Sequence, residues 1–362
     1  MKKLITSEAV TEGHPDKICD KIADKILDTA LSQDKNSKMA VEATIKDELI
    51  LIYGEANTKA KIDYEKVAKS VLKDIGYKEE YQVIIKVSEQ SSEIANAVIK
   101  DVICAGDQGI MFGYATNETK EYMPLSILLA NKLAKKMAEV RKEDDASILR
   151  PDGKTQVTVE YVDGIPKRID TIIIATQHQE NIDKKELENL IKDSVINPII
   201  PSELMDNDTK ILINTSGSFV VGGSFGDSGT TGRKIVVDTY GGVAKVGGGC
   251  FSSKDPSKVD RSAAYYARYV AKNIVANNYA NKCEVGLSYA IGKVEPISID
   301  IETFGTNKKT LSEIEEYVFA NFNFSVDNII KELDLLQPIY YNLAAYGHFG
   351  RDELNLSFEQ IK

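Results

Sequence analysis

Positively and negatively charged side chains alternate with glycines between residues 217 and 261, and this mixture could bind a polyanion. Backbone amides in glycine-rich segments and basic side chains hold phosphate oxygens, whereas carboxylates hold the metal ion that neutralises them. The stretch therefore indicates a site for a polyanion that carries a metal ion. Its cations are Arg233, Lys234, Lys245, Lys254, Lys258 and Arg261, and its acids are Asp227, Asp238, Asp255 and Asp260.

The alternative interpretation of this stretch is a glycine-rich surface loop with solvated lysines. Two features favour a binding site. Residues 234–238 predict a strand within the stretch, and a helix predicted from Pro256 follows it, so that a positive helix N-terminus lies near the cations. The pattern G-x-x-x-x-G-K-S/T is absent, and no G-x-G-x-x-G follows a strand to open a helix. A nucleotide would thus bind outside the two commonest nucleotide-binding folds.

His14 and Asp16 stand at the start of a predicted helix. Pro15 suits the first helical position, and an apolar i, i+4 stripe predicts that the helix continues to about Gln33. In the simpler interpretation, His14 caps the helix and Asp16 complements its dipole. In the functional interpretation, His14 donates a hydrogen bond to a phosphate or leaving oxygen and Asp16 binds a metal ion.

Three further charged residues carry weak signals on their own. Glu42 lies on the predicted hairpin 38–53 and Glu55 just after it, where a solvated sheet face is the simpler explanation. Lys154 lies on the predicted turn 150–154, where a surface lysine is the simpler explanation. These residues gain a function only if another observation brings them to the same site.

A long segment with weak periodicity follows the predicted strand 81–87. Gln90 lies near its start and Asp107 at its far end. Loops of this length inside a compact domain are often functional lids. A short buried helix around residues 94–103 is the structural alternative, and both interpretations stay open.

The composition narrows the class of protein. The chain has 362 residues, of which 43% are hydrophobic and 28% charged, so it can form two or three core-bearing units. A net charge of −10 argues against general nucleic-acid binding, and no apolar run of about 18 residues predicts a membrane span. The N-terminus has no signal-peptide pattern, and the four cysteines are scattered without a C-x-x-C. We therefore expect a cytoplasmic metabolic enzyme.

The order of predicted elements repeats three times. A long helix, a hairpin and a short helix recur, with long helices starting near residues 16, 124 and 256 and short ones near 63, 183 and 310. Further strands are predicted at 210–214 and 219–222. Half-buried hairpins need helices on one face. We predict an α+β fold of three pseudo-equivalent subdomains about a pseudo-threefold axis, each a small, mostly antiparallel sheet with helices on one face. The subdomains are 1–97, 98–220 and 221–362, interleaved in space as one catalytic unit.

Several segments together resemble the S-adenosylmethionine synthetase (methionine adenosyltransferase) family. They are GHPDK at 13–17, AGDQGIMFGYATNE at 105–118, RPDGKTQV at 150–157, TGRKIVVDTYGG at 231–242, GGGCFSSKDPSKVDRSAAY at 247–265 and AAYGHFGR at 344–351. They follow the family's order and span nearly the whole chain. The resemblance implies three pseudo-equivalent α+β subdomains. It also implies a reaction in which methionine sulfur attacks the ribose C5′ of ATP and displaces triphosphate, which is hydrolysed to pyrophosphate and phosphate.

The resemblance also implies roles for individual residues. The implied catalytic residues are His14, Lys154, Arg233, Lys254 and Lys258. The implied ATP-binding residues are His14, Asp152, Lys154, Ser218, Phe219, Asp227, Arg233, Lys234, Cys250 and Lys254. Methionine would contact Glu55, Gln90, Asp107, Asp227 and Lys258. Asp16 and Asp260 would bind two Mg²⁺ ions, Glu42 would bind K⁺, and Gln90 to Asp101 would form a flexible loop. Members of the family form homodimers with active sites at the interface, commonly paired into tetramers.

Two other functions compete with this interpretation. A different ATP enzyme, such as a kinase, would need a base for its acceptor and would release ADP. A nucleotide-binding regulator on the same scaffold would be expected to lack some of the cations, yet all the expected charged positions are present. Without the resemblance, the residues alone indicate a magnesium-dependent nucleotide enzyme without a P-loop.

Overall fold

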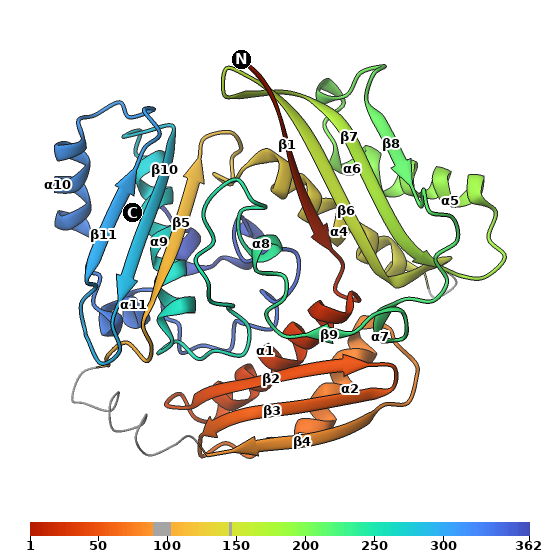
Figure 1. The fold of residues 1–362 in the computed structure, drawn as a ribbon, viewed down its shortest axis with the longest axis horizontal. Helices are drawn as coiled ribbons and strands as arrows, with labels where there is room; N and C mark the ends of the chain where they lie inside the picture. Colours follow the sequence, from red (N-terminus) through yellow and green to blue (C-terminus); the bar gives the residue numbers. More distant parts are fainter. Residues whose placement is uncertain (90–102, 145–146) are drawn as a thin grey trace.

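Residues 1–89, 103–144 and 147–362 are described by the computed structural model, and they form three small sheets with helices packed against them (Figure 1). The strands are β1 (Lys2–Val10), β2 (Lys38–Lys46), β3 (Leu49–Asn57), β4 (Gln82–Ser88), β5 (Gly109–Thr116), β6 (Leu149–Val162), β7 (Ile165–His178), β8 (Lys210–Ile213), β9 (Gly229–Thr230), β10 (Lys282–Tyr289) and β11 (Ser298–Glu302). The longer helices are α1 (Pro15–Gln33), α2 (Tyr64–Ile75), α4 (Leu125–Glu143), α5 (Lys184–Leu190), α9 (Val259–Ala276), α10 (Leu311–Asn321) and α11 (Val326–Glu332). Shorter elements are η1 (Ile191–Ile196), α6 (Asn197–Ile199), η2 (Ser202–Leu204), α7 (Gly223–Gly226), α8 (Ile235–Asp238), η3 (Asp352–Leu354) and η4 (Ser357–Glu359).

The three sheets are each built around one antiparallel hairpin. Their strand orders are β4-β3-β2-β9, β1-β6-β7-β8 and β11-β10-β5. The predicted α+β fold of three units is therefore confirmed. Two sheets also contain a parallel pair, β3 with β4 and β7 with β8, because a short helix carries the chain back along the hairpin.

Each hairpin pairs with a strand from another part of the chain. The N-terminal strand β1 joins β6, β5 joins β10, and β9 of the C-terminal third returns to β2. One strand is thus passed from each third of the chain to the sheet of the next in a closed cycle. The return of β9 brings the glycine-rich stretch to the start of α1.

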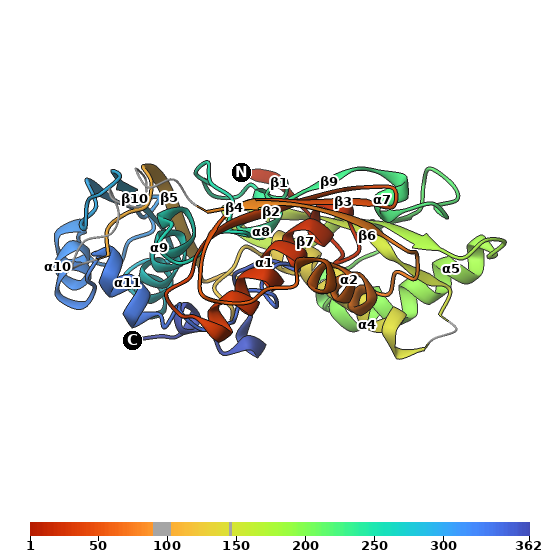
Figure 2. The same cartoon turned by 90° about the horizontal axis from the view of Figure 1, so that it is seen from below.

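The helices lie on one side of the sheets. In Figure 2, the strands run along one face of a flattened molecule, and α1, α2, α4 and α9 lie below them. One core joins α1, α2 and α9 to the first and third sheets, and a second core joins α4 to the central sheet. Ile18, Ile22, Ile26 and Ala30 are fully buried, as the predicted stripe on the first helix requires.

Helix boundaries mostly follow their capping residues. Pro15 is the first residue of α1, and the His14 side chain accepts a hydrogen bond from the Asp16 N–H. Asp63 caps α2, which ends at Gly76 in the left-handed conformation. The helix expected from Pro256 begins three residues later, at Val259, because Pro256 and Ser257 belong to a turn held by Asp255.

Three local predictions were wrong. Residues 234–238 form a helical turn at α8 and not a strand, because they lie beside α1, where the Asp238 side chain bonds Lys17. Residues 150–154 are not a turn but part of β6, whose register against β7 shifts between Leu149 and Gly153. Residues 219–222 are not a strand. The Gln177 and His178 side chains at the end of β7 hydrogen-bond the backbone of Val220 and Phe219, and no β-ladder forms there. In each case tertiary contacts override local propensity.

Candidate active site

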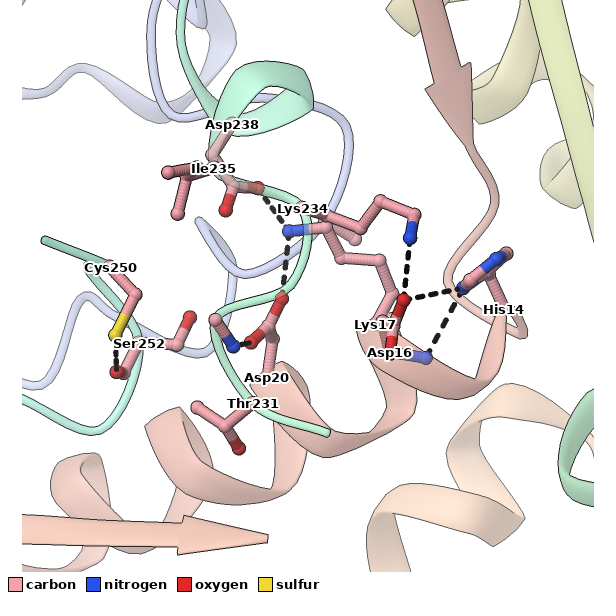
Figure 3. Close-up of polar contacts among 12 residues, drawn as sticks. His14, Asp16, Lys17, Asp20, Thr231, Lys234, Ile235, Asp238, Cys250 and Ser252 are labelled. Carbon is pink, nitrogen blue, oxygen red and sulfur yellow. Dashed lines mark hydrogen bonds and ion pairs between the residues drawn. The ribbon is translucent and has the colours of Figure 1, made fainter. Parts of the chain in front are cut away.

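One group of charges is centred on the Asp16 carboxylate at the start of α1. The Thr230 N–H donates to Asp16 Oδ1 (3.0 Å), and Lys234 Nζ donates to Asp16 Oδ2 (2.5 Å). Arg233 Nη1 lies 3.6 Å from Asp16 Oδ1. Figure 3 shows the Lys234 contact and the neighbouring His14 ring. Burial opposes ionisation here, but the hydrogen bonds from Lys234 and Thr230 hold the pKa of Asp16 below its ordinary value. We call Asp16, His14, Arg233 and Lys234 the Asp16 centre.

His14 is a neutral hydrogen-bond donor in this centre. Its Nδ1 accepts from the Asp16 N–H (3.2 Å), so the ring proton of the neutral tautomer is on Nε2. Burial and the nearby Lys234 ammonium lower the pKa of His14 to about 4. The Lys154 ammonium is close enough to lower this pKa further. At neutral pH the ring therefore offers an N–H and no positive charge.

Glycine allows the close approach that forms this centre. A Cβ atom on Gly229 would lie 2.1 Å from the Pro15 carbonyl oxygen, so a side chain cannot be placed there. Gly229 begins β9, whose next residue, Thr230, donates to Asp16. The missing side chain lets the C-terminal third of the chain lie against the first turn of α1.

A second group of charges lies at the start of α9. Lys254 Nζ donates to Asp260 Oδ2 at 2.5 Å, and the backbone of Gly249 lies directly against the Asp260 carboxylate. Lys258 forms an ion pair with the fully buried Asp255. Burial opposes ionisation of Asp255, but the Lys258 charge keeps its pKa below the ordinary value. We call Lys254, Lys258 and Asp260 the Asp260 centre.

Cys250 lies between the two centres. Its side chain is packed against Gly232, the residue before Arg233, and its Sγ lies 3.9 Å from the Ser252 carbonyl oxygen (Figure 3). Burial raises the pKa of the Cys250 thiol, so it packs as a neutral group. Glu42 on β2 lies near enough to raise this pKa further, and its Oε2 accepts from the Tyr53 hydroxyl at 3.2 Å.

The predicted nucleoside residues lie around the irregular start of β6. Asp152 is buried, and its Oδ2 accepts from the Gly223 N–H (2.8 Å). Burial raises the pKa of Asp152 to about 6 against the effect of that hydrogen bond. Asp227 is exposed and close enough to raise the same pKa, whereas Lys154 lowers it. Lys154 is exposed and 3.9 Å from Glu8. Ser218 is exposed and Phe219 half-buried.

Two residues of the predicted methionine site adjoin the Asp260 centre. Glu55 is exposed and pairs with Ala40 in the β2–β3 ladder, and Ala40 forms an isolated bridge with Lys254. Asp107 is exposed between Gly106, which lies against Ser257, and Gly109, which lies against Asp260. Gln90 and the predicted flexible loop, Gln90 to Asp101, lie outside the described residues.

The carboxylates fit a magnesium ion that is shared with a polyphosphate. Groups of three or more metal-ligating side chains do not occur within residues 1–89, 103–144 and 147–362. Mg²⁺ usually takes one or two carboxylates and completes its shell with phosphate oxygens and water. Asp16 and Asp260 are each 2.5 Å from a lysine ammonium, Lys234 and Lys254 respectively. Each carboxylate thus already binds one positive charge, as a magnesium ligand must.

Several residues that support the two centres were not predicted from the sequence. Asp20 and Asp24 follow Asp16 at four-residue intervals on α1, a spacing that was visible in the sequence and predicts one common helix face. Gln177 and His178 hold the segment around Phe219, where Phe219 N–H donates to His178 Nε2 (3.1 Å). Conversely, Arg261 and Asp238 are buried in ion pairs, and Lys245 pairs with Glu284.

The fold is a three-sheet α+β protein with two centres that each combine cations and a carboxylate. Three family models match the chain in order: S-adenosylmethionine synthetase N-terminal domain at residues 2–102, central domain at 102–219 and C-terminal domain at 221–360. The chain belongs to the S-adenosylmethionine synthetase family. It is a methionine adenosyltransferase, which makes S-adenosylmethionine from ATP and methionine.

We also compared the helices of the described residues with the requirements for a membrane span. None of those within the described ranges combines the length and the apolar character that crossing a bilayer requires. Helices α1 and α9 each carry one of the predicted metal-binding aspartates. Asp16 lies in the first turn of α1 and Asp260 in the first turn of α9.

Proposed function

We propose that methionine sulfur attacks C5′ of ATP in one step and that the triphosphate leaves as a unit. A sulfur lone pair forms the S–C5′ bond, and the electrons of the C5′–O5′ bond pass to the triphosphate. The triphosphate is then hydrolysed to pyrophosphate and phosphate before release. The observation that carries the proposal is that cationic and neutral donors surround Asp16, with His14 held uncharged.

This chemistry needs electrostatic stabilisation more than proton transfer. A thioether sulfur is neutral and already nucleophilic, whereas the leaving group accumulates negative charge. Preorganised donors aimed at that charge lower the barrier, as do groups that orient the reactants. One cation about 4 Å from an oxyanion contributes about 4 kcal/mol at an effective dielectric constant near 20. Several such cations together approach the ~8–23 kcal/mol that enzymes supply.

We assign the charged residues to the departing triphosphate. His14 donates its Nε2 proton to a phosphate or leaving oxygen, and Lys154, Arg233, Lys234 and Lys254 hold phosphate oxygens. Lys258 serves both the phosphates and methionine. Lys234 and Lys254 each donate to one of the two carboxylates that we assign to Mg²⁺, so each ammonium lies where metal-bound phosphates would be held.

We assign the remaining residues to the nucleoside and to methionine. Phe219 stacks on adenine, and ATP also contacts Asp152, Ser218, Asp227 and Cys250. Methionine contacts Glu55, Gln90, Asp107 and Asp227, and the segment from Gln90 to Asp101 gates the site. Support for the methionine end comes from Glu55 and Asp107, which adjoin the segment that carries Lys254 and Asp260.

We assign Asp16 and Asp260 to two Mg²⁺ ions and Glu42 to K⁺. Bound Mg²⁺ neutralises part of the triphosphate charge. Asp16 is 2% exposed and held by two donors, and this arrangement orients one carboxylate before the ligand arrives. Asp260 lies in the first turn of α9, where the helix N-terminus also favours an anionic ligand.

We further propose a cytoplasmic homodimer with the active sites at its interface, and a tetramer made of two such dimers. The sheets lie along one side of the molecule and the helices along the other (Figure 2). Leu4, Leu49, Ile84 and Ile110 on the strands are each at least 40% exposed, which is apolar area that a second copy could bury. Cys19, Cys250 and Cys283 are thiols, a state that a reducing compartment maintains. Sedimentation of a monomer with full activity would contradict the dimer.

The decisive experiment resolves all products of a reaction with ATP, methionine, Mg²⁺ and K⁺. The expected result is S-adenosylmethionine with equal amounts of pyrophosphate and phosphate and without ADP. Formation of ADP independently of methionine would support the kinase alternative. Tight nucleotide binding without turnover would support a regulator instead.

A further inference from the structure

Four aspartates form a column on one face of α1. Asp16, Asp20, Asp24 and Asp28 are spaced by four residues, so their side chains lie above one another along the helix. Asp16 belongs to the site itself. Each of the other three accepts backbone N–H groups from a different segment of the C-terminal third: Gly232, Ser253, and Tyr340 with Tyr341.

Asp20 holds the segment that carries Arg233 and Lys234. Its Oδ1 accepts from the Gly232 N–H at 2.8 Å, and its Oδ2 lies 3.0 Å from Lys17 Nζ. Lys17 also forms an ion pair with Asp238, the last residue of α8. The segment from Gly232 to Asp238 is thus bound to α1 at both ends, and Figure 3 shows the contacts of Lys17 with Asp20 and Asp238. Lys17 and Asp20 are fully buried, whereas Arg233 between the bound ends is exposed.

Asp24 holds the segment that precedes Lys254 in the same way. Its carboxylate accepts from the Ser252 hydroxyl (3.0 Å), the Ser253 N–H (3.2 Å) and both terminal nitrogens of Arg261 (2.7 and 2.8 Å). Arg261 also donates to the Lys254 carbonyl oxygen at 3.3 Å. Asp24 and Arg261 are buried, so this contact is shielded from water and salt.

We infer that Asp20 and Asp24 are positioning residues that set the separation of the Arg233–Lys234 pair from Lys254 along a bound triphosphate. The two aspartates are one helical turn apart, a rigid spacing of about 6 Å along the axis. Two loops rich in glycine would otherwise hold their cations loosely. The inference rests on the proposed function, because it takes these cations to bind the triphosphate.

Asp28 provides the matched control. It lies on the same face of the same helix and accepts two backbone N–H groups, from Tyr340 (3.0 Å) and Tyr341 (2.8 Å). The segment that it holds contains none of the predicted site residues. A purely structural role for the column predicts equal effects on ligand binding at Asp20 and Asp28, whereas positioning predicts an effect at Asp20 and Asp24 and none at Asp28.

The test compares Asp20→Ala with Asp28→Ala in the full-length protein. The affinity for inorganic triphosphate with Mg²⁺ is measured by calorimetry, and kcat and KM for methionine are measured separately. We expect Asp20→Ala to weaken triphosphate binding and to lower kcat by about tenfold or more each, because a charged hydrogen bond is lost. KM for methionine should stay within about twofold, and Asp28→Ala should match the wild type in all three. Equal triphosphate affinity in the two variants overturns the inference.

Asparagine variants keep the test valid if the alanine variants do not fold. Asp20→Asn and Asp24→Asn retain an oxygen that can accept the Gly232 or Ser253 N–H, so triphosphate affinity should lie between those of the wild type and the alanine variants. Asp28→Asn is the control. If Asp20→Asn and Asp28→Asn, both folded, bind triphosphate equally well, the inference fails. The wild type distinguishes the two proposals: if it binds triphosphate but makes no S-adenosylmethionine by this route, the proposed function fails and the positioning test still stands.

Discussion

The Asp16 centre and the Asp260 centre contain the same type of ion pair, but different parts of the chain form them. Each pairs one carboxylate with one lysine ammonium at 2.5 Å. Asp260 and Lys254 are six residues apart in one segment, whereas Asp16 and Lys234 are separated by 218 residues. The Asp16 carboxylate also accepts the Thr230 N–H, and its side chain is 2% exposed against 15% for Asp260.

The comparison indicates that the Asp16 carboxylate is preorganised by the fold, whereas the Asp260 carboxylate can adapt its position. Asp16 is held by backbone and side-chain donors from the C-terminal third of the chain, so its position depends on the whole fold. Asp260 depends mainly on the first turn of α9 and on the neighbouring glycine backbone. We expect changes at the Asp16 centre to affect both stability and activity, and changes at the Asp260 centre to affect mainly ligand binding.

The largest expected effect comes from removing the lysines. Lys234→Met and Lys254→Met each remove a cation aimed at the leaving group, and we expect kcat for S-adenosylmethionine formation to fall by about 10²–10³-fold, as for other single donors to developing charge. The matched control is Lys245→Met, since Lys245 is an exposed lysine of the same stretch that pairs with Glu284. If kcat falls no further in Lys234→Met or Lys254→Met than in Lys245→Met, the assignment of Lys234 and Lys254 to the leaving triphosphate is wrong.

His14 distinguishes the two centres, because the Asp260 centre as defined contains no histidine. If the neutral Nε2–H donates to a phosphate oxygen, His14→Ala should lower kcat by about 10–100-fold and His14→Gln, which keeps an N–H donor, by less. The pKa of His14 is lowered to about 4, so its charge does not change between pH 5.5 and 8. The pH profile of kcat/KM for the wild type should therefore contain no inflection near pH 6.5 that comes from His14. An inflection near pH 6.5 that is present in the wild type and absent in His14→Gln would refute the neutral-donor role.

The stability of the ligand-free protein tests the contrast directly. Asp16→Asn leaves Lys234 without its ionised partner in a largely buried setting, and we expect a loss of about 1–3 kcal/mol in the free energy of unfolding. Asp260→Asn breaks a more exposed pair and should cost less than about 1 kcal/mol. Urea denaturation without Mg²⁺ or nucleotide measures both. Equal losses would mean that the two centres are equally preorganised.

The smallest expected effect is a pH dependence at Asp152, beside the Asp16 centre. Burial raises the folded-state pKa of Asp152 to about 6, above its ordinary value of 3.8. The folded protein therefore binds the proton more tightly, so the stabilisation from Asp152 is complete below pH 3.8 and is lost as the pH rises through 6. The difference in unfolding free energy between wild type and Asp152→Asn should decrease over this window. A difference that does not change with pH would rule out the raised pKa.

Local patterns in the sequence predicted the elements whose signals are short-range. The stripe of Ile18, Ile22 and Ile26, the proline at the first helical position and the cap at Asp63 all gave correct helices. The strand predicted at residues 234–238 was wrong because a five-residue pattern carries no information about distant partners. In the fold Asp238 pairs with Lys17 of α1, and the segment forms the helical turn α8. The turn predicted at residues 150–154 was wrong because distant strands hold this segment extended: β7 pairs with Leu149 before it and with Gly153 and Lys154 at its end, and β1 pairs with Lys154.

The sequence by itself determined which chemistry is available: cations, carboxylates and glycines in segments that resemble one enzyme family, later matched by three family models along the chain. Only the tertiary structure decided which of these charges lie together at the candidate site and which are buried elsewhere. Lys234 and Arg261 look alike in the sequence, yet Lys234 meets Asp16 at the site and Arg261 is buried against Asp24. The physical reason is that burial depends on strands and helices contributed by distant parts of the chain, and a buried charge must find its partner there.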